Sequence, residues 1–244
     1  MYVYYDNYVV QNLFVNMYIS FILLTIALSF IIINLSKKFQ FLLDIKSENH
    51  KKFTSTQKNY SIGGILLIIF FMLNYLDRME YLNTLFYFLI FSIGLLSDLK
   101  TLNSPKLRFL LQIFFLILFI FLLDIRIFNT RIDIFDELLK NNVLNYFFVV
   151  FCLMILINGN NFVDGINTLL INYYLIIFGT LLFFLPEFIH NTEFLKYFII
   201  LLLVILAFNL SGKIILGDSG SYVLGLFSGI YLINFSNQNL FISP

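Results

Sequence analysis

Charged residues are scarce in this chain, and cysteine is nearly absent. Of its 244 residues, 12% are charged and 60% are hydrophobic, and phenylalanine alone accounts for 32. A soluble domain has about a quarter charged and about half apolar residues. One water-soluble core cannot bury such an excess, so we expect the lipid bilayer to be the solvent of this protein.

Other missing features narrow the function classes further. The net charge of +1 decides nothing by itself, but a basic stripe for a phosphate backbone is lacking, so we expect no nucleic-acid partner. The single cysteine, Cys152, lies in an apolar run, which excludes an intrachain disulfide and favours a small core side chain. The first apolar run, about 15–35, is too long for the core of a cleavable signal.

Eight apolar segments predict transmembrane helices, although several are shorter than the about 20 residues of a full crossing. Lipid cannot satisfy free backbone polar groups, and the segments lack the alternation of barrel strands. We therefore predict an all-α fold, a polytopic transmembrane helix bundle of about eight spans in one domain, residues 1–244. The predicted spans are 13–35, 61–76, 81–97, 107–124, 143–158, 166–185, 194–215 and 219–235.

Basic residues are unevenly divided between the two sets of loops that eight crossings create. The loops 36–60, 98–106, 159–165 and 216–218, with the flanking helix ends, hold ten of the fifteen basic residues. The opposite loops hold five basic residues and nine of the fourteen acidic ones. The positive-inside rule therefore predicts that the first set is cytoplasmic and that both chain ends lie outside the cell membrane.

Four unusual polar stretches fall on the predicted cytoplasmic side. They are "SIGGI" (61–65), "GLLSDLKTLNSPKLR" (94–108), "NGNNFVDGINTL" (158–169) and "GDSGSYVLG" (217–225). Such stretches interrupt otherwise apolar sequence, and they are far apart along the chain. Their gathering on one membrane face predicts a single functional site.

Three carboxylates carry most of the predicted chemistry. Asp98, Asp164 and Asp218 each stand at the end of an apolar span, where an ionisable group is costly and is a functional candidate. A single such aspartate is more often a helix cap, but three on one face favour a site. Carboxylate and amide oxygens without cysteine or clustered histidine suit Mg²⁺ bound together with substrate phosphates.

The surrounding residues fit a phosphorylated substrate. Lys106 and Arg108 supply positive charge, although positive-inside topology alone would also place them there. Gly63–Gly64 and the glycines at 217 and 220 permit close backbone approach, and helices that begin there would offer amide donors to an anion. Small residues also pack membrane helices. The residues by themselves thus predict a Mg²⁺-dependent site for a phosphorylated substrate at the cytoplasmic membrane surface.

The four stretches, in this order, resemble the motifs of the polyprenyl-phosphate N-acetylhexosamine-1-phosphate transferases (glycosyltransferase family 4). "GLLSD" is similar to the family's G-x-x-D-D, "NGNNFVDG" to N-x-x-N-x-x-D-G, and "GDSGSYVLG" to G-D-x-G-S-x-x-L-G. The resemblance covers about residues 36–235. It implies transfer of a HexNAc-1-phosphate from a UDP-HexNAc to undecaprenyl phosphate, with Mg²⁺ as cofactor, at the cytoplasmic face of the inner (plasma) membrane. A homodimer is among the assemblies that it allows.

The resemblance also assigns roles to residues. Asp218 and Asn161 would hold Mg²⁺ on the diphosphate, and Asn167 with the backbone of Gly165 would bind the uracil. Asp164 would order this loop or assist the metal, and Asp98 would lie near the acceptor phosphate. Asp98, Asp164 and Asp218 are therefore the predicted catalytic residues. The predicted substrate-binding residues are Gly165, Asn167, Lys106 and Arg108, of which the last two would neutralise phosphate oxygens.

Two departures from the family pattern and three alternatives accompany this prediction. Ser97 stands where the family has its first aspartate, and relatives continue past the position of Pro244 with further helices and a His-rich cytoplasmic loop that this sequence is expected to lack. A non-catalytic fragment of such an enzyme is one alternative. A secondary transporter would place its helix breaks near mid-depth. A CDP-alcohol phosphotransferase would follow Asp-Gly with Ala-Arg and two further aspartates.

Overall fold

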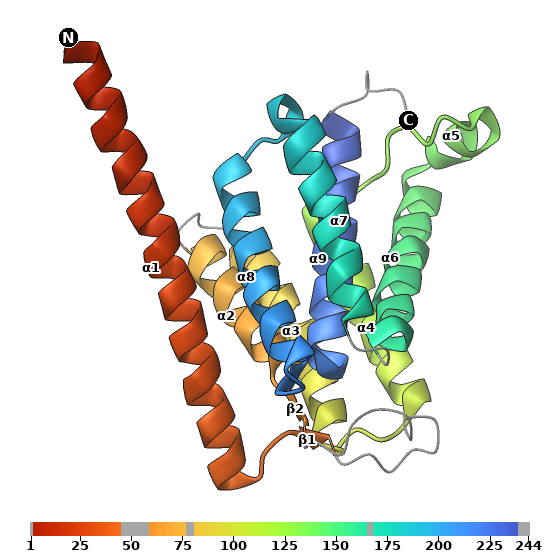
Figure 1. The fold of residues 1–244 in the computed structure, drawn as a ribbon. Coiled ribbons are helices and arrows are strands. Elements are labelled where there is room, and N and C mark those ends of the chain that lie inside the picture. The colour runs from red at the N-terminus through yellow and green to blue at the C-terminus, as the bar shows by residue number, and fades with distance from the viewer. Residues whose placement is uncertain (1, 45–58, 77–80, 165–167, 239–244) are drawn as a thin grey trace.

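The structure is a computed structural model that describes residues 2–44, 59–76, 81–164 and 168–238. Within these residues, eight helices of 14 to 38 residues form one bundle, and each overlaps one of the eight predicted apolar spans (Figure 1). They are α1 (Tyr2–Phe39), α2 (Gly63–Leu76), α3 (Tyr81–Asp98), α4 (Pro105–Leu123), α6 (Asn142–Asp164), α7 (Leu169–Phe184), α8 (Thr192–Leu210) and α9 (Gly217–Gln238). The predicted all-α bundle is therefore confirmed.

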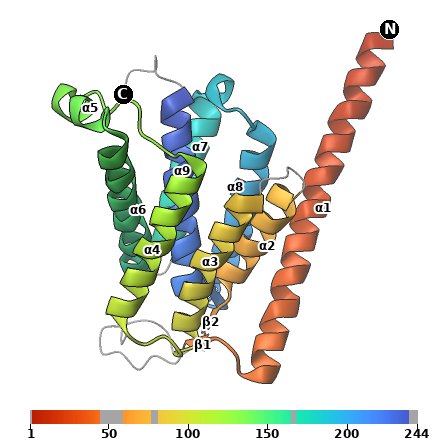
Figure 2. The ribbon, with the colours of Figure 1, turned by 180° about the vertical axis from the view of Figure 1, so that it is seen from behind.

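Among the described residues, five of these helices are long and apolar enough to cross a membrane. They are α1 from Val15 onward, α3, α4, α6 and α8, whereas the apolar helices α2 and α7 are shorter. The start of α1 and the end of α9 lie at the same end of the bundle, as an even number of crossings requires (Figures 1 and 2). Eight crossings with both termini outside the cell thus stay a prediction.

Helix α9 lies at the centre of the bundle, where α6, α3 and α2 pack against it most closely. Every residue from Ser219 to Ile230 is buried. The crossings are tight because glycines form them: a Cβ at Gly94 would lie 2.4 Å from Ser219 Cα, and one at Gly225 would lie 2.8 Å from Ile157 Cα. Small residues allow this close backbone approach in membrane helix bundles. They also give α9 a sequence less apolar than its burial suggests.

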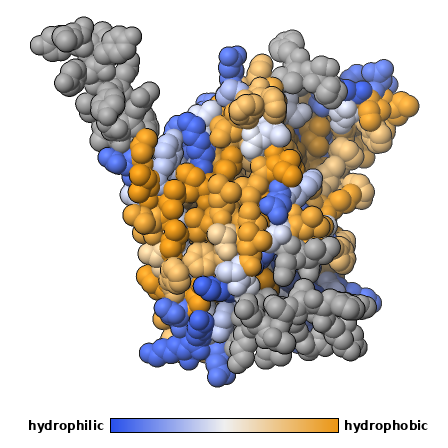
Figure 3. Space-filling view, in the orientation of Figure 1, coloured by the Kyte–Doolittle hydropathy of each residue, from blue (hydrophilic) through white to orange (hydrophobic). Residues whose placement is uncertain are grey.

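The outer helices present apolar side chains to their surroundings. Leucine, isoleucine and phenylalanine side chains are exposed along α1 and on the outer faces of α4 and α6. Figure 3 shows a broad hydrophobic band across the middle of one face, with hydrophilic residues gathered toward the two ends. Large contiguous apolar surfaces of this kind mark contact with a membrane or a partner. The band and the five long helices together identify a membrane protein.

A small sheet at one end of the bundle joins the starts of α2 and α9. Strand β2 (Asn59–Ser61) pairs antiparallel with β1 (Leu43–Asp44) and parallel with β3 (Ile214–Ile215). The parallel pairing places Ser61 beside Ile215, so the segments that lead into α2 and α9 lie side by side. Gly217 has a φ of +72°, a conformation that favours glycine, at the turn from β3 into α9.

The strands were not predicted, and three helix ends lie well away from the predicted ones. The predicted span 13–35 was wrong at its start, because α1 begins at Tyr2. The predicted span 194–215 was wrong at its end, because α8 stops at Leu210 and β3 follows. The predicted loop 159–165 was also wrong in part: α6 continues to Asp164, and its amide side chains point from a helix. The short helices α5 (Asp133–Leu139) and η2 (Pro186–Phe188) were not predicted. These segments lack the long apolar pattern that membrane spans display.

Candidate active site

Four helices have an end at the side of the bundle where the sheet lies (Figure 1), and polar side chains from these ends meet there. Helices α3 and α6 end there, at Asp98 and Asp164, while α4 and α9 begin there, near Arg108 and Asp218. The topology of alternating crossings brings these ends to one level. The predicted gathering of distant polar stretches is therefore what the fold produces, and it lies at the end of the helices instead of halfway along them.

Asp218, in the first turn of α9, is the centre of this cluster. Its Oδ1 accepts a hydrogen bond from Asn161 Nδ2 at 2.6 Å. Its Oδ2 accepts from Ser97 Oγ at 2.5 Å and from Arg108 Nη1 at 2.5 Å. Arg108 also donates to Ser97 Oγ. The side chains of Arg108 and Asp218 are 21% and 26% exposed, so their ion pair is partly shielded from solvent.

Asp98 lies beside Asp218 but points at the backbone of α9. Its Oδ1 accepts from the Asp218 amide at 2.9 Å, and its Oδ2 accepts from the Ser219 amide at 3.0 Å and from Ser219 Oγ at 2.7 Å. The first N–H groups of a helix have no partner within the helix, and they favour negative charge. Asp98 thus occupies the anion-binding position at the start of α9. The amides at this position had been predicted to bind an anionic group of the substrate.

Asn161 and Asp164 reach the same place from the last turn of α6. Because residues three apart lie on one helix face, both side chains are directed toward the start of α9. Asp164 Oδ2 accepts from the Gly217 amide at 3.0 Å, while Asn161 binds the Asp218 side chain. Two carboxylates from different helices therefore hold consecutive amides of α9. This arrangement fixes the position of Asp218.

A second group of hydrogen bonds joins α6 to the neighbouring helices α4 and α7. Buried Asn160 is paired with Tyr174 on α7, with Nδ2 and Oδ1 each within 2.9 Å of the Tyr174 hydroxyl oxygen. Asn158 Nδ2 donates to Gln112 Oε1 on α4 at 3.1 Å. Sequence analysis did not single out Tyr174, Gln112 or Ser219. Gln112 and Tyr174 lie inside apolar runs, where an isolated polar residue is the only available signal.

The remaining predicted site residues divide into two groups. Lys106 lies exposed in the first turn of α4 and forms no hydrogen bond or ion pair with another described residue, whereas Arg108 reaches Asp218. Gly165 and Asn167, predicted to bind uracil, lie outside the described residues. The roles of Asp98, Asn161, Asp164 and Asp218 in a reaction stay predictions, although the structure brings all four together.

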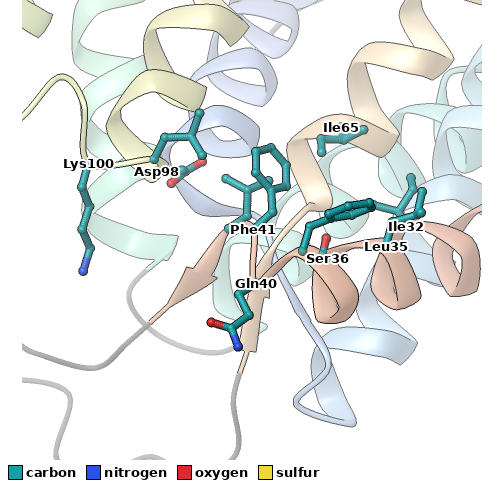
Figure 4. A pocket seen from close by; sticks show the side chains of 11 residues that line it. Ile32, Leu35, Ser36, Gln40, Phe41, Ile65, Asp98 and Lys100 are labelled. Atoms are coloured by element: carbon teal, nitrogen blue, oxygen red, sulfur yellow. The ribbon is translucent and has the colours of Figure 1, made fainter.

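A cavity of about 710 Å³ borders the cluster. Figure 4 shows Asp98 on one side of this cavity, with Ile32 and Leu35 of α1 and Ile65 of α2 on the other. Most of the lining is apolar, and Ser36, Gln40, Asp98 and Lys100 are the polar residues in it. The space is therefore suited to an apolar chain that ends at a polar group.

The donor set fits Mg²⁺ in kind. Asp218 and Asn161 both carry hard oxygen donors, and the two side chains are adjacent, with Asn161 Nδ2 donating to Asp218 Oδ1 at 2.6 Å. Among the described residues no group of three histidine, cysteine, aspartate or glutamate side chains forms a protein-only metal cage. Mg²⁺ is commonly held by one or two carboxylates together with substrate phosphates and water. A metal that arrives with a diphosphate matches this site better than one bound by protein alone.

Comparison with known proteins agrees with the geometry. A sequence model described as glycosyl transferase family 4 matches residues 80–236, which is more than half of the chain. The match includes Asp98, Arg108, Asn161, Asp164 and Asp218. No curated protein matches the sequence at a significant level.

The chain belongs to glycosyl transferase family 4. Its membership supports a function of the glycosyl-1-phosphate transferase kind, and the five long apolar helices are those of a membrane protein.

Proposed function

We propose that this protein transfers a HexNAc-1-phosphate from a UDP-HexNAc to undecaprenyl phosphate, at the cytoplasmic face of the inner (plasma) membrane. The observation that carries the proposal is the convergence of Ser97, Arg108 and Asn161 on the single carboxylate of Asp218. Side chains from three helices, α3, α4 and α6, position one charged group on a fourth, α9. Such pre-organisation is what phosphoryl-type transfer requires, because the protein contributes chiefly positioning and charge neutralisation.

In the proposed reaction, an oxygen of the lipid phosphate attacks the β-phosphorus of the UDP-sugar. A new P–O bond forms to the lipid phosphate, the bond from the β-phosphorus to the bridging oxygen breaks, and UMP leaves with that oxygen. Asp218 and Asn161 would hold Mg²⁺, which when bound neutralises charge on the diphosphate. Arg108 would bind phosphate oxygens, and Lys106, at the exposed start of α4, would add positive charge nearby. Gly165 and Asn167 keep their proposed contact with uracil.

The apolar cavity supports a lipid as the acceptor. It reaches Asp98 from the side of α1 and α2, which contribute the apolar lining residues Ile32, Leu35 and Ile65. A soluble acceptor would have no use for such a lining, since burying apolar surface is favourable only for an apolar ligand. In this proposal Asp98 is a positioning residue, because both of its oxygens are engaged by α9.

The transporter alternative is weakened by where the polar residues lie. Transporters bind substrate near the bilayer midplane at interrupted helices. Here Asp98 and Asp164 are the last residues of their helices, and Asp218 is in a first turn. A site at one membrane face favours an enzyme whose donor comes from the aqueous side. It also fits the proposed cytoplasmic location, to which the basic residues of the flanking loops contribute.

The test is a transfer assay on the purified full chain in detergent or lipid. Undecaprenyl phosphate and Mg²⁺ are incubated with separate UDP-HexNAc donors, and both UMP release and label in the lipid are measured. We expect both products in equal amounts with at least one donor. A non-catalytic protein would release no UMP and label no lipid with any of the donors, and that result would overturn the proposal. The variant Asp218→Asn serves as the inactive reference.

A further inference from the structure

Arg108 is in direct contact with Asp218, the carboxylate that is proposed to bind the metal. Its Nη1 lies 2.5 Å from Asp218 Oδ2, and the same oxygen accepts a hydrogen bond from Ser97. The other carboxylate oxygen accepts from Asn161. Both oxygens of the carboxylate are therefore engaged, and one of them faces a full positive charge. A divalent cation and a guanidinium in contact with one oxygen would repel each other strongly.

The guanidinium has donor capacity left over. Arg108 Nε is buried, and it has no hydrogen-bond partner among the described residues. A guanidinium presents five N–H donors in a planar fork that matches two oxygens of a phosphate. Because a buried donor without a partner is unfavourable, an incoming phosphate would satisfy a group that the protein itself does not. A bound phosphate would thus supply the hydrogen-bond acceptor that Arg108 Nε lacks.

We propose that Arg108 is the counter-ion of Asp218 in the substrate-free protein and moves to the diphosphate of the nucleotide when that substrate binds. The move releases Asp218 to a divalent cation, so metal and diphosphate bind cooperatively. This inference rests on the proposed function, since it concerns the order in which metal and donor occupy the same site. Lys106 takes no part in the exchange, because it makes no contact with Asp218.

Ser97 is consistent with this exchange. Its hydroxyl contacts both the carboxylate of Asp218 and the guanidinium of Arg108, and it carries no charge. A second carboxylate at this position would bind the guanidinium more strongly and would also attract a metal in the absence of nucleotide. With serine there, Asp218 is the one charged side chain that pairs with Arg108 among the described residues. The departure from the family's two aspartates thus leaves the exchange dependent on one ion pair.

The experiment measures binding of Mn²⁺ to the full chain in detergent by electron paramagnetic resonance, without nucleotide and with saturating UDP. The wild-type protein should bind Mn²⁺ weakly alone and about 5-fold or more tightly with UDP, after correction for binding of Mn²⁺ to free UDP. Arg108→Gln should bind Mn²⁺ about 5-fold or more tightly than wild type without nucleotide. The further gain on adding UDP should be smaller than in wild type, because only the phosphate ligands are then added and no ion pair has to open. Asp218→Asn should lose the Mn²⁺ site under both conditions.

Lys106→Gln is the matched control, since it removes one positive charge from the same helical turn without touching Asp218. Its nucleotide-free affinity for Mn²⁺ should stay close to that of wild type. Equal affinities for Arg108→Gln and Lys106→Gln would overturn the proposal. If Arg108→Gln does not fold, the wild-type arm decides alone: no increase in Mn²⁺ affinity with UDP also overturns it. These readings need no turnover, so failure of the transfer assay with the exchange intact would reject only the proposed function.

Discussion

The two ends of the helix bundle hold similar polar residues but use them differently. At the end away from the sheet, buried Asn145 accepts from the Ile127 amide at 3.0 Å and donates to the carbonyl oxygens of Ile127 and Leu139 at 2.8 and 3.0 Å. Asn237 likewise accepts from the Phe128 amide and donates to the Arg126 carbonyl. These amide side chains replace backbone hydrogen bonds that an irregular loop cannot make.

At the end with the sheet, Asp98 and Asp164 also accept from backbone amides, but three side-chain hydrogen bonds gather on one charge. Asn161, Ser97 and Arg108 all donate to Asp218. Nothing in the backbone requires this grouping, and its members come from different helices. An amide bonded to a loop backbone is therefore structural, whereas an amide, a hydroxyl and a cation from three helices that converge on one partly buried carboxylate indicate a site.

The largest effect is expected from Asp218→Asn, which removes the charge at the centre of the site. The asparagine keeps the shape and a hydrogen-bond acceptor, but the attraction for a metal and for Arg108 is lost. Transfer activity should fall by about 100-fold or more, comparable with the loss of one pre-organised electrostatic group. UMP release measures the activity, and the thermal unfolding midpoint shows whether the fold persists. Activity near the wild-type level would remove Asp218 from the reaction.

Gly94→Ala should disturb the site by moving the helix that carries it. The new Cβ would lie 2.4 Å from Ser219 Cα, so α3 and α9 must separate or tilt. Overpacking of this kind destabilises a protein by about 1–3 kcal/mol, and it should also shift the Asp98 cap and reduce activity. Both the unfolding midpoint and UMP release should decrease.

Gly179→Ala in α7 is the matched control for that variant, because nothing lies within 4 Å of its added Cβ. Alanine also has the higher helix propensity, so this control should be as stable as wild type or slightly more so. If the two variants behave alike, the close packing of α3 against α9 does not position the site.

Asn145→Ala tests the opposite end of the bundle. It leaves the amide of Ile127 and two carbonyl oxygens without their partner in a largely buried place. Each unsatisfied buried group costs about 1–3 kcal/mol, so the unfolding midpoint should fall clearly. The activity of the protein that remains folded should be unchanged, which is the reverse of the result for Asp218→Asn. A loss of activity at full stability would show that the two ends are not separate in function.

Much of this difference between the ends was visible in the sequence, and part was not. The apolar spans located the helices, and the motifs around Asp98, Asn161, Asp164 and Asp218 predicted that these residues would meet. Periodicity and composition were sufficient because lipid leaves the backbone few alternatives to helix. The sequence could not show that Asp98 faces amides of α9, since a cap contributed by another helix leaves no local pattern.

Two further features escaped prediction for physical reasons. The strands of the sheet are two or three residues long, too short for an alternating pattern, and the pairing of β2 with β3 joins segments more than 150 residues apart. Arg108 and Lys106 were predicted together, because both are cations at the start of one helix. Only the geometry separates them: Arg108 turns toward Asp218, while Lys106 remains exposed.

The smallest effect is expected at Asp124, which follows α4 at the end away from the sheet. Hydrogen bonds from the Tyr146 hydroxyl and from Arg126 hold the pKa of the Asp124 carboxyl below its usual value. A depressed pKa in the folded state means that the stabilisation is present above the unfolded pKa of about 3.9 and is lost as the pH falls through the folded value.

Asp124→Asn should therefore lower the unfolding midpoint slightly at neutral pH, and the difference from wild type should shrink below about pH 4. Asp136, whose pKa is lowered by hydrogen bonds from Thr130, is present in both proteins and cancels in this comparison. Activity at neutral pH should not change, because Asp124 belongs to the end that serves only the loops. A difference that instead grows as the pH falls would mean that the carboxyl is destabilised by its surroundings, and the assignment of a structural ion pair to this end would then be wrong.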